Sequence, residues 1–472
     1  MILRFFLILT VCFASPALSQ TTSTETHYVA PIGATLTGTA DGSLEHPWSS
    51  VSAAIRSGYI TGGETLLLMD GDYGVLKFYN NRFDIPVVIR SLDEKAAHFE
   101  QINIGDNSGN LVFRNLSVWR NDPVSAPAGQ LILSHPSSFD ITIEGCDLRG
   151  GGETSNDYLS WSLEDWGYAR NGIFLRGPNS IIRNNQLTGI AFGIQVFGDD
   201  SSVMGNVISG FSGDGIRAIG HRNIIRGNWI ENAFDVSSNH DDGIQSWRHS
   251  GRESVEDLVI ENNTIIEWAG PADHPLRSTL QGIGLFDGFF DNLVIRNNVI
   301  AVTLWHGLSV YGGRQAIIAN NTVVHNDGLV EGRPWIGVFD HKNGTPSEGV
   351  LVANNLAMRM KGPSGGAVFT DNSVIFDPAA VFEDISTFNY IPTVDSGFVD
   401  TANTNYAPPL DIAGNARPIG NGPDRGAYEA GGTTTTTTGG ETTTTTTTDG
   451  KPQRNGGPKW DVSPGRGKRD KQ

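Results

Sequence analysis

Residues 185–216 read NQLTGIAFGIQVFGDDSSVMGNVISGFSGDGI and contain two copies of one pattern. Asn185 is followed by the triplet Phe192-Gly193-Ile194, and Asn206, 21 residues later, is followed by Asp214-Gly215-Ile216. Short apolar stretches separate these landmarks. A unit of about 22 residues with short strands is what a parallel β-helix requires, because each coil buries one face against the coils beside it.

The same two landmarks recur along most of the chain. The glycine motif has eight members: Asn171-Gly172-Ile173, Phe192-Gly193-Ile194, Asp214-Gly215-Ile216, Asp242-Gly243-Ile244, Gln281-Gly282-Ile283, His306-Gly307-Leu308, Ile336-Gly337-Val338 and Gly366-Ala367-Val368. An asparagine ladder runs between them: Asn185, Asn206, Asn228, Asn263, Asn298, Asn321 and Asn355. Its spacings of 21, 22, 35, 35, 23 and 34 residues indicate a constant coil with insertions. Stacked asparagines can hydrogen-bond along the axis, and Cys146 occupies the same slot as Asn185.

These repeats predict an all-β, single-domain parallel β-helix over residues 27–430. Residues 49–60 (SSVSAAIRSGYI) indicate a short amphipathic helix that caps the N-terminal end, and Thr65 begins the first strands. Residues 431–450 are rich in Thr and Gly and predict a linker. Residues 451–472 are basic, have no apolar core and predict a disordered tail.

The first 20 residues predict a signal peptide that is cleaved near residue 19 or 20. Arg4 precedes an apolar run from Phe5 to Ala14, which is too short to span a bilayer. We therefore expect an exported protein, periplasmic or extracellular, without a membrane span. Cleavage leaves Cys146 as the sole cysteine, so an intramolecular disulfide is excluded.

The net charge of −18 is unevenly distributed. Because residues 1–19 contribute +1 and residues 451–472 contribute +5, the body from 20 to 450 carries −24. Such a body argues against nonspecific nucleic-acid binding. It is compatible with Ca²⁺, and an acidic substrate would need a locally basic groove. We expect a monomer.

Both ends of the predicted solenoid resemble a known superfamily. The opening Tyr28-Val29-Ala30-Pro31-Ile32-Gly33 and His46-Pro47-Trp48, and the close from Asp411-Ile412-Ala413-Gly414 through Arg425-Gly426-Ala427-Tyr428-Glu429, look like the first and last coils of the pectate-lyase-like proteins. The resemblance implies a right-handed helix. It does not fix the reaction, because one fold carries many activities.

Long loops cluster at 228–242, 242–263, 263–281 and 321–336, and such clusters usually build a site. Seven of the eleven histidines lie between residues 221 and 341, around these loops, with Trp229, Trp247, Trp268, Trp305 and Trp335. Aromatic faces stack on sugar rings, so the mixture predicts a polysaccharide groove. We expect about half of these tryptophans to pack the loops instead.

We number each repeat so that the residue before its glycine is position zero. Side chains at positions two and four should then point inward, and those at positions three and five outward. The outward set includes Arg217, Gln245, Ser309, Trp247, Phe286, Tyr311 and His341. Position zero carries Asp214, Asp242, Gln281 and His306 on successive coils, so we expect Asp214 and Asp242 to be neighbours about 4.8 Å apart.

Asp214, followed one coil later by Asp241-Asp242, resembles the three-aspartate site of polygalacturonases. That resemblance implies an inverting hydrolase with a carboxyl acid and a carboxylate base. The family's Gly-His-Gly on the following coil is replaced by Leu280-Gln281-Gly282. Trp305-His306-Gly307 resembles it one coil late.

The alternative is β-elimination on a uronic acid, which needs a group that neutralises the carboxylate and a base that removes the acidified proton. Arg217, Arg248, His240, Tyr311 and Lys342 would form a cationic strip, with Ca²⁺ on Asp241, Asp242 and Asp287 as a further candidate. Mannuronan-epimerase signatures are not intact, but a uronate epimerase shares the proton-abstraction step and stays an alternative. We order the hypotheses as a lyase of an alginate- or pectin-like polymer, then a hydrolase, then a non-catalytic polysaccharide-binding surface protein. His240, Asp241, Asp242, Arg248, Lys342, Asp214 and His306 are the catalytic candidates, and Arg217, Gln245, Trp247, Gln281, Tyr311 and His341 the substrate-binding ones.

Overall fold

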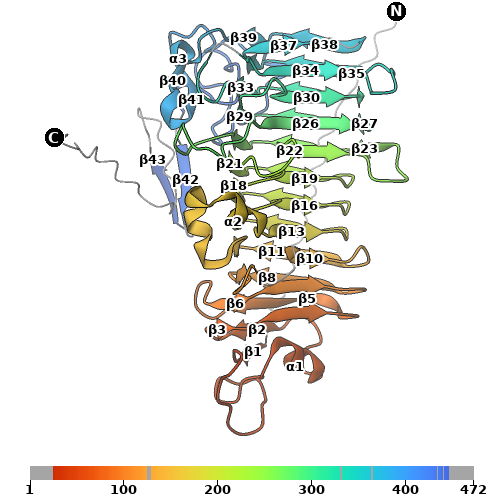
Figure 1. The fold of residues 1–472 in the computed structure, drawn as a ribbon. Helices are drawn as coiled ribbons and strands as arrows, with labels where there is room; N and C mark the ends of the chain where they lie inside the picture. Colours follow the sequence, from red (N-terminus) through yellow and green to blue (C-terminus); the bar gives the residue numbers. More distant parts are fainter. Residues whose placement is uncertain are drawn as a thin grey trace, which may run out of the picture.

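The computed structural model describes residues 25–124, 129–329, 332–362, 365–432, 434–438 and 441–445. The predicted signal peptide and basic tail lie outside these residues. The chain winds as a solenoid whose coils stack from the N-terminal end to the C-terminal end (Figure 1). Within the described residues, long parallel sheets form its three sides, as the repeats predict.

The sheet at the front of Figure 1, called the front sheet below, receives one strand from each coil. Its strands are β4 (Val75–Phe78), β7 (Gln101–Ile104), β10 (Gln130–Ser134), β13 (Asn171–Leu175), β16 (Ile194–Val196), β19 (Ile216–Ala218), β22 (Asp242–Trp247), β26 (Gln281–Asp287), β30 (Leu308–Tyr311), β34 (Trp335–Phe339) and β37 (Arg359–Lys361).

The second side precedes the front sheet in each coil and holds shorter strands. They are β3 (Gly71–Asp72), β6 (Ala97–Phe99), β9 (Ser117–Trp119), β12 (Asp147–Arg149), β15 (Gln186–Ile190), β18 (Val207–Phe211), β21 (Trp229–Ala233), β25 (Thr264–Ile266), β29 (Val299–Ala301), β33 (Thr322–Val324), β36 (Leu356–Ala357) and β39 (Ser373–Val374).

The third side begins at the N-terminus and carries a short branch. Its strands are β1 (Thr26–Val29), β2 (Thr65–Leu68), β5 (Arg82–Ser91), β8 (Gly109–Arg114), β11 (Phe139–Glu144), β14 (Ile181–Arg183), β17 (Ser202–Met204), β20 (Ile224–Arg226), β24 (Val259–Glu261), β28 (Val294–Arg296), β32 (Ile317–Ala319), β35 (Glu348–Ala353) and β38 (Gly366–Thr370), with β23 (Ser254–Glu256), β27 (Phe289–Asp291) and β31 (Gly313–Arg314) in the branch.

Short elements lie outside the three sides. Helix α1 (Val51–Arg56) caps the N-terminal end, as predicted, with Ser50 as its N-cap and Val51 and Ala54 buried in the core. The other elements are η1 (Gly152–Ser160), α2 (Leu163–Gly167), α3 (Pro378–Val381), β40 (Phe382–Asp384), η2 (Ile385–Thr387), β41 (Asn389–Pro392), β42 (Thr434–Thr438) and β43 (Glu441–Thr445). β42 and β43 pair antiparallel in the segment where the sequence predicts a linker.

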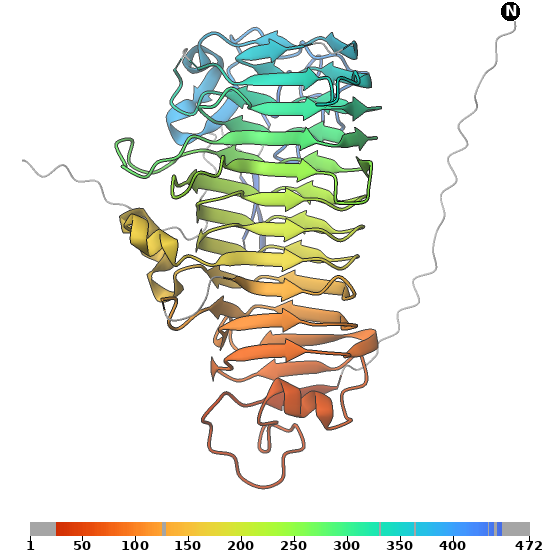
Figure 2. The ribbon, with the colours of Figure 1, turned by 45° about the vertical axis from the view of Figure 1, so that its right-hand side comes forward.

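The insertion that carries η1 and α2 projects from the side of the solenoid (Figure 2). Tyr158, Trp161 and Trp166 pack there against Phe234 and Trp268, which belong to loops of later coils. This satellite cluster removes large aromatic surfaces from water. It therefore supports the long loops beside the front sheet.

The core is built from stacked side chains at equal positions of successive coils. Ile173, Ile194, Ile216 and Ile244 are in register on β13, β16, β19 and β22, and each is fully buried. Because neighbouring side chains of a strand face opposite sides, the intervening residues point outward. The predicted inward and outward positions are confirmed for these coils.

The glycine of the repeat is required by close approach between coils. A Cβ atom on Gly282 would lie 2.2 Å from the carbonyl oxygen of Gly307 on the next coil. Gly215 and Gly193 face their successors in the same way, at 2.7 and 2.2 Å. Any side chain would collide with backbone that cannot move without disturbing the ladder, which explains the motif.

The asparagine ladder is confirmed as a continuous chain of buried hydrogen bonds. Asn263 Nδ2 donates to Asn298 Oδ1 at 3.0 Å and to the Ile225 carbonyl at 2.9 Å. Its own Oδ1 accepts from the backbone N–H and from Nδ2 of Asn228. The ladder begins at Cys146, whose N–H donates to Asn185, and extends beyond Asn355 to Asn372, which the sequence analysis missed.

Two members of the predicted glycine motif are wrong. Strand pairing aligns Ser309 with Gly337 and Leu308 with Ile336, so Gly337 stands at position three and Trp335 at position one. The pattern misled because Trp335 takes the place of the usual glycine. Gly366-Ala367-Val368 belongs to β38, which pairs with β35 on the third side.

The predicted last coil, residues 411–430, is also wrong. Residues 393–432 carry no strand of the three sides in the described structure and cross the outside of the solenoid. Asn297, Asn320 and Asn354 have positive φ angles and donate from Nδ2 to the carbonyls of Leu410, Asp424 and Asn403. Arg417 and Glu429 are both buried, and Arg417 Nη1 donates to Glu429 Oε1 at 2.5 Å. This ion pair holds the segment together.

Candidate functional site

The residues at position zero form a column at the start of the front-sheet strands. Asp242 pairs with Gln281 across β22 and β26, and the Gly282 N–H donates to the His306 carbonyl one coil later. Asp242 N–H donates to Asp214 Oδ1 at 3.0 Å. The predicted succession Asp214, Asp242, Gln281, His306 is therefore confirmed.

Asp214 holds the turn of the next coil. Besides accepting from the Asp242 N–H, it accepts at Oδ2 from Arg217 Nε at 2.5 Å. Arg217 also lies over the Phe192 ring, with Cζ 4.0 Å from the centroid. Both oxygens of this buried carboxylate are thus occupied, and the cation of Arg217 is compensated.

Asp242 has the same position but a different environment. It is fully buried, and Oδ2 accepts from Gln245 Nε2 at 2.9 Å, while Oδ1 has no hydrogen-bond partner. Its carboxyl group lies across the outer face of the next coil, where a Cβ atom on Gly284 would come within 2.3 Å of Oδ1. Glycine at 284 therefore makes the space for this carboxyl group beside Phe286. An unpartnered buried oxygen is rare in a native protein.

Asp241 and Asp242 do not face the groove, and that expectation is wrong. Asp241 is only 3 % exposed and accepts from Asn239 Nδ2 and Ser278 Oγ, so its loop folds over it. Burial, with smaller contributions from Asp214 and Asp235, raises the pKa of Asp241 to about 7 against the opposing hydrogen bonds from Asn239 and Ser278. Burial, and then Asp214 and Asp241, raise the pKa of Asp242 well above its usual value. Carboxyl groups with pKa values perturbed in this way are characteristic of functional sites.

Two histidines lie above and beside the buried carboxyls. The His240 side chain is 70 % exposed, and its Nδ1 lies 3.8 Å from Asp242 Oδ2. His306 is half-buried, and both burial and His240 lower its pKa. A neutral imidazole therefore stands at position 306 at neutral pH.

Ser309 determines which nitrogen of His306 carries the hydrogen. Its buried hydroxyl accepts from Trp335 Nε1 at 3.0 Å and lies 2.9 Å from His306 Nδ1. The buried hydroxyl hydrogen needs an acceptor of its own, and Nδ1 lies within hydrogen-bond distance of it, so we assign that hydrogen to the bond with Nδ1. His306 Nε2 then carries N–H and is a donor. Ser309 stands at an outward position but is covered by Trp335, which the sequence could not indicate.

Aromatic rings continue the site toward the C-terminal end. Trp305, 59 % exposed, lies parallel to Trp335, with centroids 6.0 Å apart. Tyr311 stacks on Phe339 at 4.6 Å, and Phe286 contacts both His306 and Tyr311. These rings lie beside the column of polar residues. By contrast, Trp268 is buried in the satellite cluster, as expected of about half of the tryptophans.

Several predicted site residues lie at the other end of the strands. Asp287 is the last residue of β26, about 20 Å along the strand from Gln281. Its carboxylate pairs with Lys342 Nζ at 2.6 Å and not with Arg248, whose guanidinium donates to the Arg252 carbonyl. Trp247 lies near that end as well, 5.4 Å from the Arg217 guanidinium.

The register shift of β34 also changes the setting of His341 and Lys342. Both follow the strand in a turn and are not outward strand residues, and the His341 ring stacks on Phe289. The predicted cationic strip is therefore divided. Arg217 and Lys342 are each compensated by a carboxylate.

The predicted calcium ligands do not come together. Asp241 and Asp242 lie at the start of the front-sheet strands, whereas Asp287 lies at the opposite end. Within the described ranges, no group of three His, Cys, Asp or Glu side chains is arranged to hold a metal ion. One ion cannot bridge these three carboxylates.

Glu267 is a positioning residue that the sequence analysis missed. It is fully buried and accepts from the Leu280 N–H, the Thr303 N–H and hydroxyl, and Arg277. Leu280 precedes Gln281, and Thr303 stands three residues before His306. Glu267 thus joins the loops that present both residues. The sequence offers one signal for this role, a single acidic residue directly after the apolar pair Ile265-Ile266.

Residues 171–373 match the family model described as the right handed beta helix region. The solenoid is a right-handed β-helix. Its handedness is that expected from the resemblance at its ends, and the matched region contains every residue of the site. A comparison with curated proteins found no match.

Solved structures similar to this β-helix include pectate lyase Pel9A, at 15% identity and TM-score 0.44 over 86% of this chain and 97% of that one. The Dettilon tailspike protein has 16% identity and TM-score 0.47, over 74% and 67% of the two chains. The A-module of the Azotobacter vinelandii mannuronan C-5 epimerase AlgE4 has 13% identity and TM-score 0.43, over 73% and 95%. At these identities the likeness concerns the fold alone. No described helix of the β-helix protein has the length and apolarity to cross a membrane.

The raised pKa of Asp241 predicts how stability changes with pH. Since the folded pKa is about 7 and the usual value 3.8, the folded state holds a proton that the unfolded state releases between these values. The stabilisation is full below pH 3.8 and is lost as the pH rises through 7, with a total of at most about 4 kcal/mol. Asp241→Asn should not lose stability as the pH rises. Its urea midpoint should therefore be higher than that of the wild type at pH 8 but not at pH 4. An equal difference between the two proteins at both pH values would contradict this prediction.

Proposed function

We propose that this protein is a secreted polysaccharide lyase that cleaves a uronic-acid-containing polymer along the front sheet. The proposal rests on which polar groups of the site are accessible to a substrate. The three carboxyls are buried, whereas the His240 imidazole is exposed and Gln281 and His306 are half-buried. Imidazoles and an amide are therefore the groups within reach of a sugar chain, and they suit proton abstraction better than hydrolysis.

His240 is assigned as the base. It removes the proton from the carbon that bears the uronate carboxylate, and the electron pair of that C–H bond becomes the new carbon–carbon double bond. The bond from the neighbouring ring carbon to the glycosidic oxygen breaks. The leaving oxygen accepts a hydrogen bond from His306 Nε2 and takes its proton from solvent, to which protonated His240 then returns the proton it removed. Asp242, whose Oδ2 lies 3.8 Å from His240 Nδ1, is assigned to orient the imidazole.

Gln281 is assigned to the substrate carboxylate. It stands between Asp242 and His306 in the column, and its side chain is half-buried there. An amide N–H aimed at the carboxylate favours the charge that develops there during proton removal. The aromatic rings around Trp305 and Tyr311 supply stacking faces for the flanking sugars.

A second candidate, an inverting hydrolase, is favoured by a different observation. Asp241 and Asp242 both have raised pKa values and can carry a proton at neutral pH, as a general acid must. In that reaction His240 would have to move aside, because it lies over Asp242.

One experiment separates these reactions. The purified protein is incubated with alginate, polygalacturonate and a neutral polysaccharide, and both ultraviolet absorbance and reducing ends are followed. Elimination gives reducing ends together with the absorbance of the unsaturated uronate. Reducing ends without that absorbance would replace the lyase with the hydrolase, and the absence of both would favour a binding protein.

A further inference from the structure

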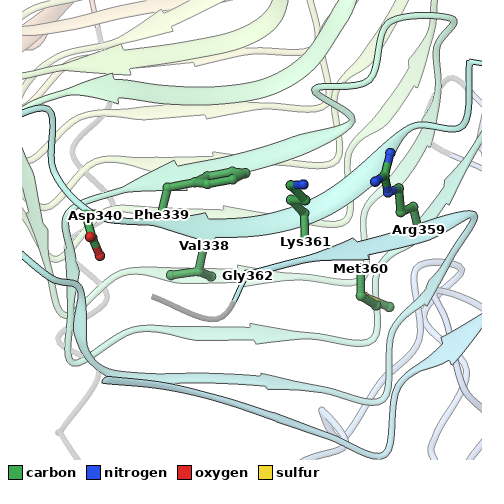
Figure 3. Close-up of a pocket in the computed structure, with 7 residues that line it drawn as sticks. All are labelled: Val338, Phe339, Asp340, Arg359, Met360, Lys361 and Gly362. Carbon is green, nitrogen blue, oxygen red and sulfur yellow. The ribbon is translucent and has the colours of Figure 1, made fainter. Parts of the chain in front are cut away.

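The last strand of the front sheet carries two exposed cations. Arg359 and Lys361 on β37 are in register with Trp335 and Gly337 of β34, at outward positions. They are two residues apart on one strand, about 7 Å. Figure 3 shows both side chains rising from the same face as Phe339, while Met360 and Val338 point the other way.

Both cations border an open hollow of about 560 Å³. It is lined by Val338, Phe339, Asp340, Arg359, Met360, Lys361 and Gly362. Asp340 lies at the opposite end of this group from Arg359 (Figure 3). Negative charge in the hollow is thus separated from the positive pair.

These cations differ from the others on the front sheet. Arg217 and Lys342 are compensated by Asp214 and Asp287. In the part of the chain that the structure describes, neither Arg359 nor Lys361 forms an ion pair, and their contacts are with the Trp335 ring, at 5.8 and 5.9 Å from its centroid. The body from residue 20 to 450 carries a net charge of −24, so this pair of cations is a local patch of opposite charge.

The pair is continuous with the candidate site. Trp335 lies parallel to Trp305, contacts His306 at 5.1 Å and donates to Ser309. Trp335 is buried and Trp305 is exposed, so a sugar would stack on Trp305, and its charged substituents would lie toward Arg359 and Lys361, which contact the Trp335 ring behind it. Guanidinium and ammonium groups are the usual partners of carboxylate and sulfate groups.

We propose that Arg359, Lys361 and the exposed Trp305, which Trp335 supports from behind, form a subsite for an anionic sugar at the C-terminal end of the front sheet. It binds the carboxylate or sulfate of a residue next to the cleaved bond. The inference rests on the proposed function for its place along the substrate. It concerns binding, however, so it can be tested apart from cleavage.

The test measures binding of the full-length protein by calorimetry. The probes are a polyuronate oligosaccharide, the same oligosaccharide with its carboxyl groups reduced, and a sulfated neutral oligosaccharide. The wild type should bind the polyuronate about 10-fold or more tightly than its reduced form. The variant Arg359→Gln/Lys361→Gln should lose most of that preference, and its affinity should depend less on salt.

Lys77→Gln/Arg56→Gln is the matched control. It removes two cations from the N-terminal end, where Lys77 is exposed on β4 and Arg56 ends α1. Both variants keep the basic tail, so its attraction for acidic polymers is common to all three proteins. The control should retain the preference of the wild type.

The outcomes distinguish the two proposals. Loss of the preference in the Arg359/Lys361 variant without any elimination by the wild type supports the subsite and contradicts the lyase. Elimination by the wild type, with unchanged binding and KM in the variant, contradicts the subsite alone. Equal loss in the control variant also contradicts it, because nonspecific charge would then explain the binding. If the variant loses binding of the sulfated oligosaccharide, the subsite accepts both carboxylate and sulfate groups. If the variant keeps that binding, the subsite is restricted to carboxylates.

Discussion

Replacement of His240 by alanine is expected to lower kcat/KM on the cleaved polymer by about 10²- to 10⁴-fold, the usual contribution of a general base. The melting temperature should stay within about 1 °C of the wild type, because surface substitutions away from a packed feature change stability little. The His240 side chain is 70 % exposed, and its Nδ1 approaches Asp242 Oδ2 to 3.8 Å. Initial rates of double-bond formation and a thermal melt of the same preparation check both parts.

His249→Ala is the matched control, since His249 is an exposed histidine in the loop at the other end of β22. It should retain full activity. Asp242→Asn should lower kcat more than it changes KM, because Asp242 acts through His240 and does not touch the sugar. A fully active His240→Ala protein would contradict the assignment of the base, and activity lost only in proportion to unfolding would assign His240 a structural role.

Asn263→Ala is expected to have the largest effect on stability, a loss of roughly 3–5 kcal/mol. The substitution removes an amide that makes four buried hydrogen bonds. It leaves the Asn228 N–H without its acceptor, takes one of the two acceptors of Asn228 Nδ2 and removes a donor from the Ile225 carbonyl, in a place that water does not reach. The shift of the urea midpoint, followed by circular dichroism, measures the loss.

The preceding residue offers the control. Asn262 has a φ of 58°, and its Oδ1 has no partner. Glycine adopts this conformation readily, so Asn262→Gly should stay within about 1 kcal/mol of the wild type. If both substitutions destabilised the protein equally, backbone strain at this corner, and not the ladder, would hold the coils in register.

The repeats predicted the solenoid because the asparagine ladder and the stacked glycines of the motif place the same requirement on every coil. Asn263 needs its equivalents above and below, and Gly282 faces a carbonyl that leaves no room for a Cβ atom. Such rules appear in the sequence as a period. The rule failed at β34, where Trp335 occupies the glycine position and a nearby Gly337 imitates the motif two residues late.

The site was predictable only as a column of positions. Sequence periodicity placed Asp214, Asp242, Gln281 and His306 side by side, which is correct. It could not show that Asp242 is covered, because the cover comes from Gln245, Phe286 and the His240 loop, whose course depends on tertiary contacts. Nor could it find Glu267, whose partners Leu280 and Thr303 are 13 and 36 residues away.

The ladder has a consequence for how such a protein can change over time. Each rung depends on the rungs above and below it and not on the path of the chain between them. The structure joins Asn185 to Asn206 after 21 residues and Asn228 to Asn263 after 35, with bonds of the same length. Long excursions can therefore be gained, lost or exchanged between coils while the frame stays in place. The loop that carries His240 is in this sense an interchangeable module, and transplanting it between the equivalent asparagines of another β-helix should leave that host folded.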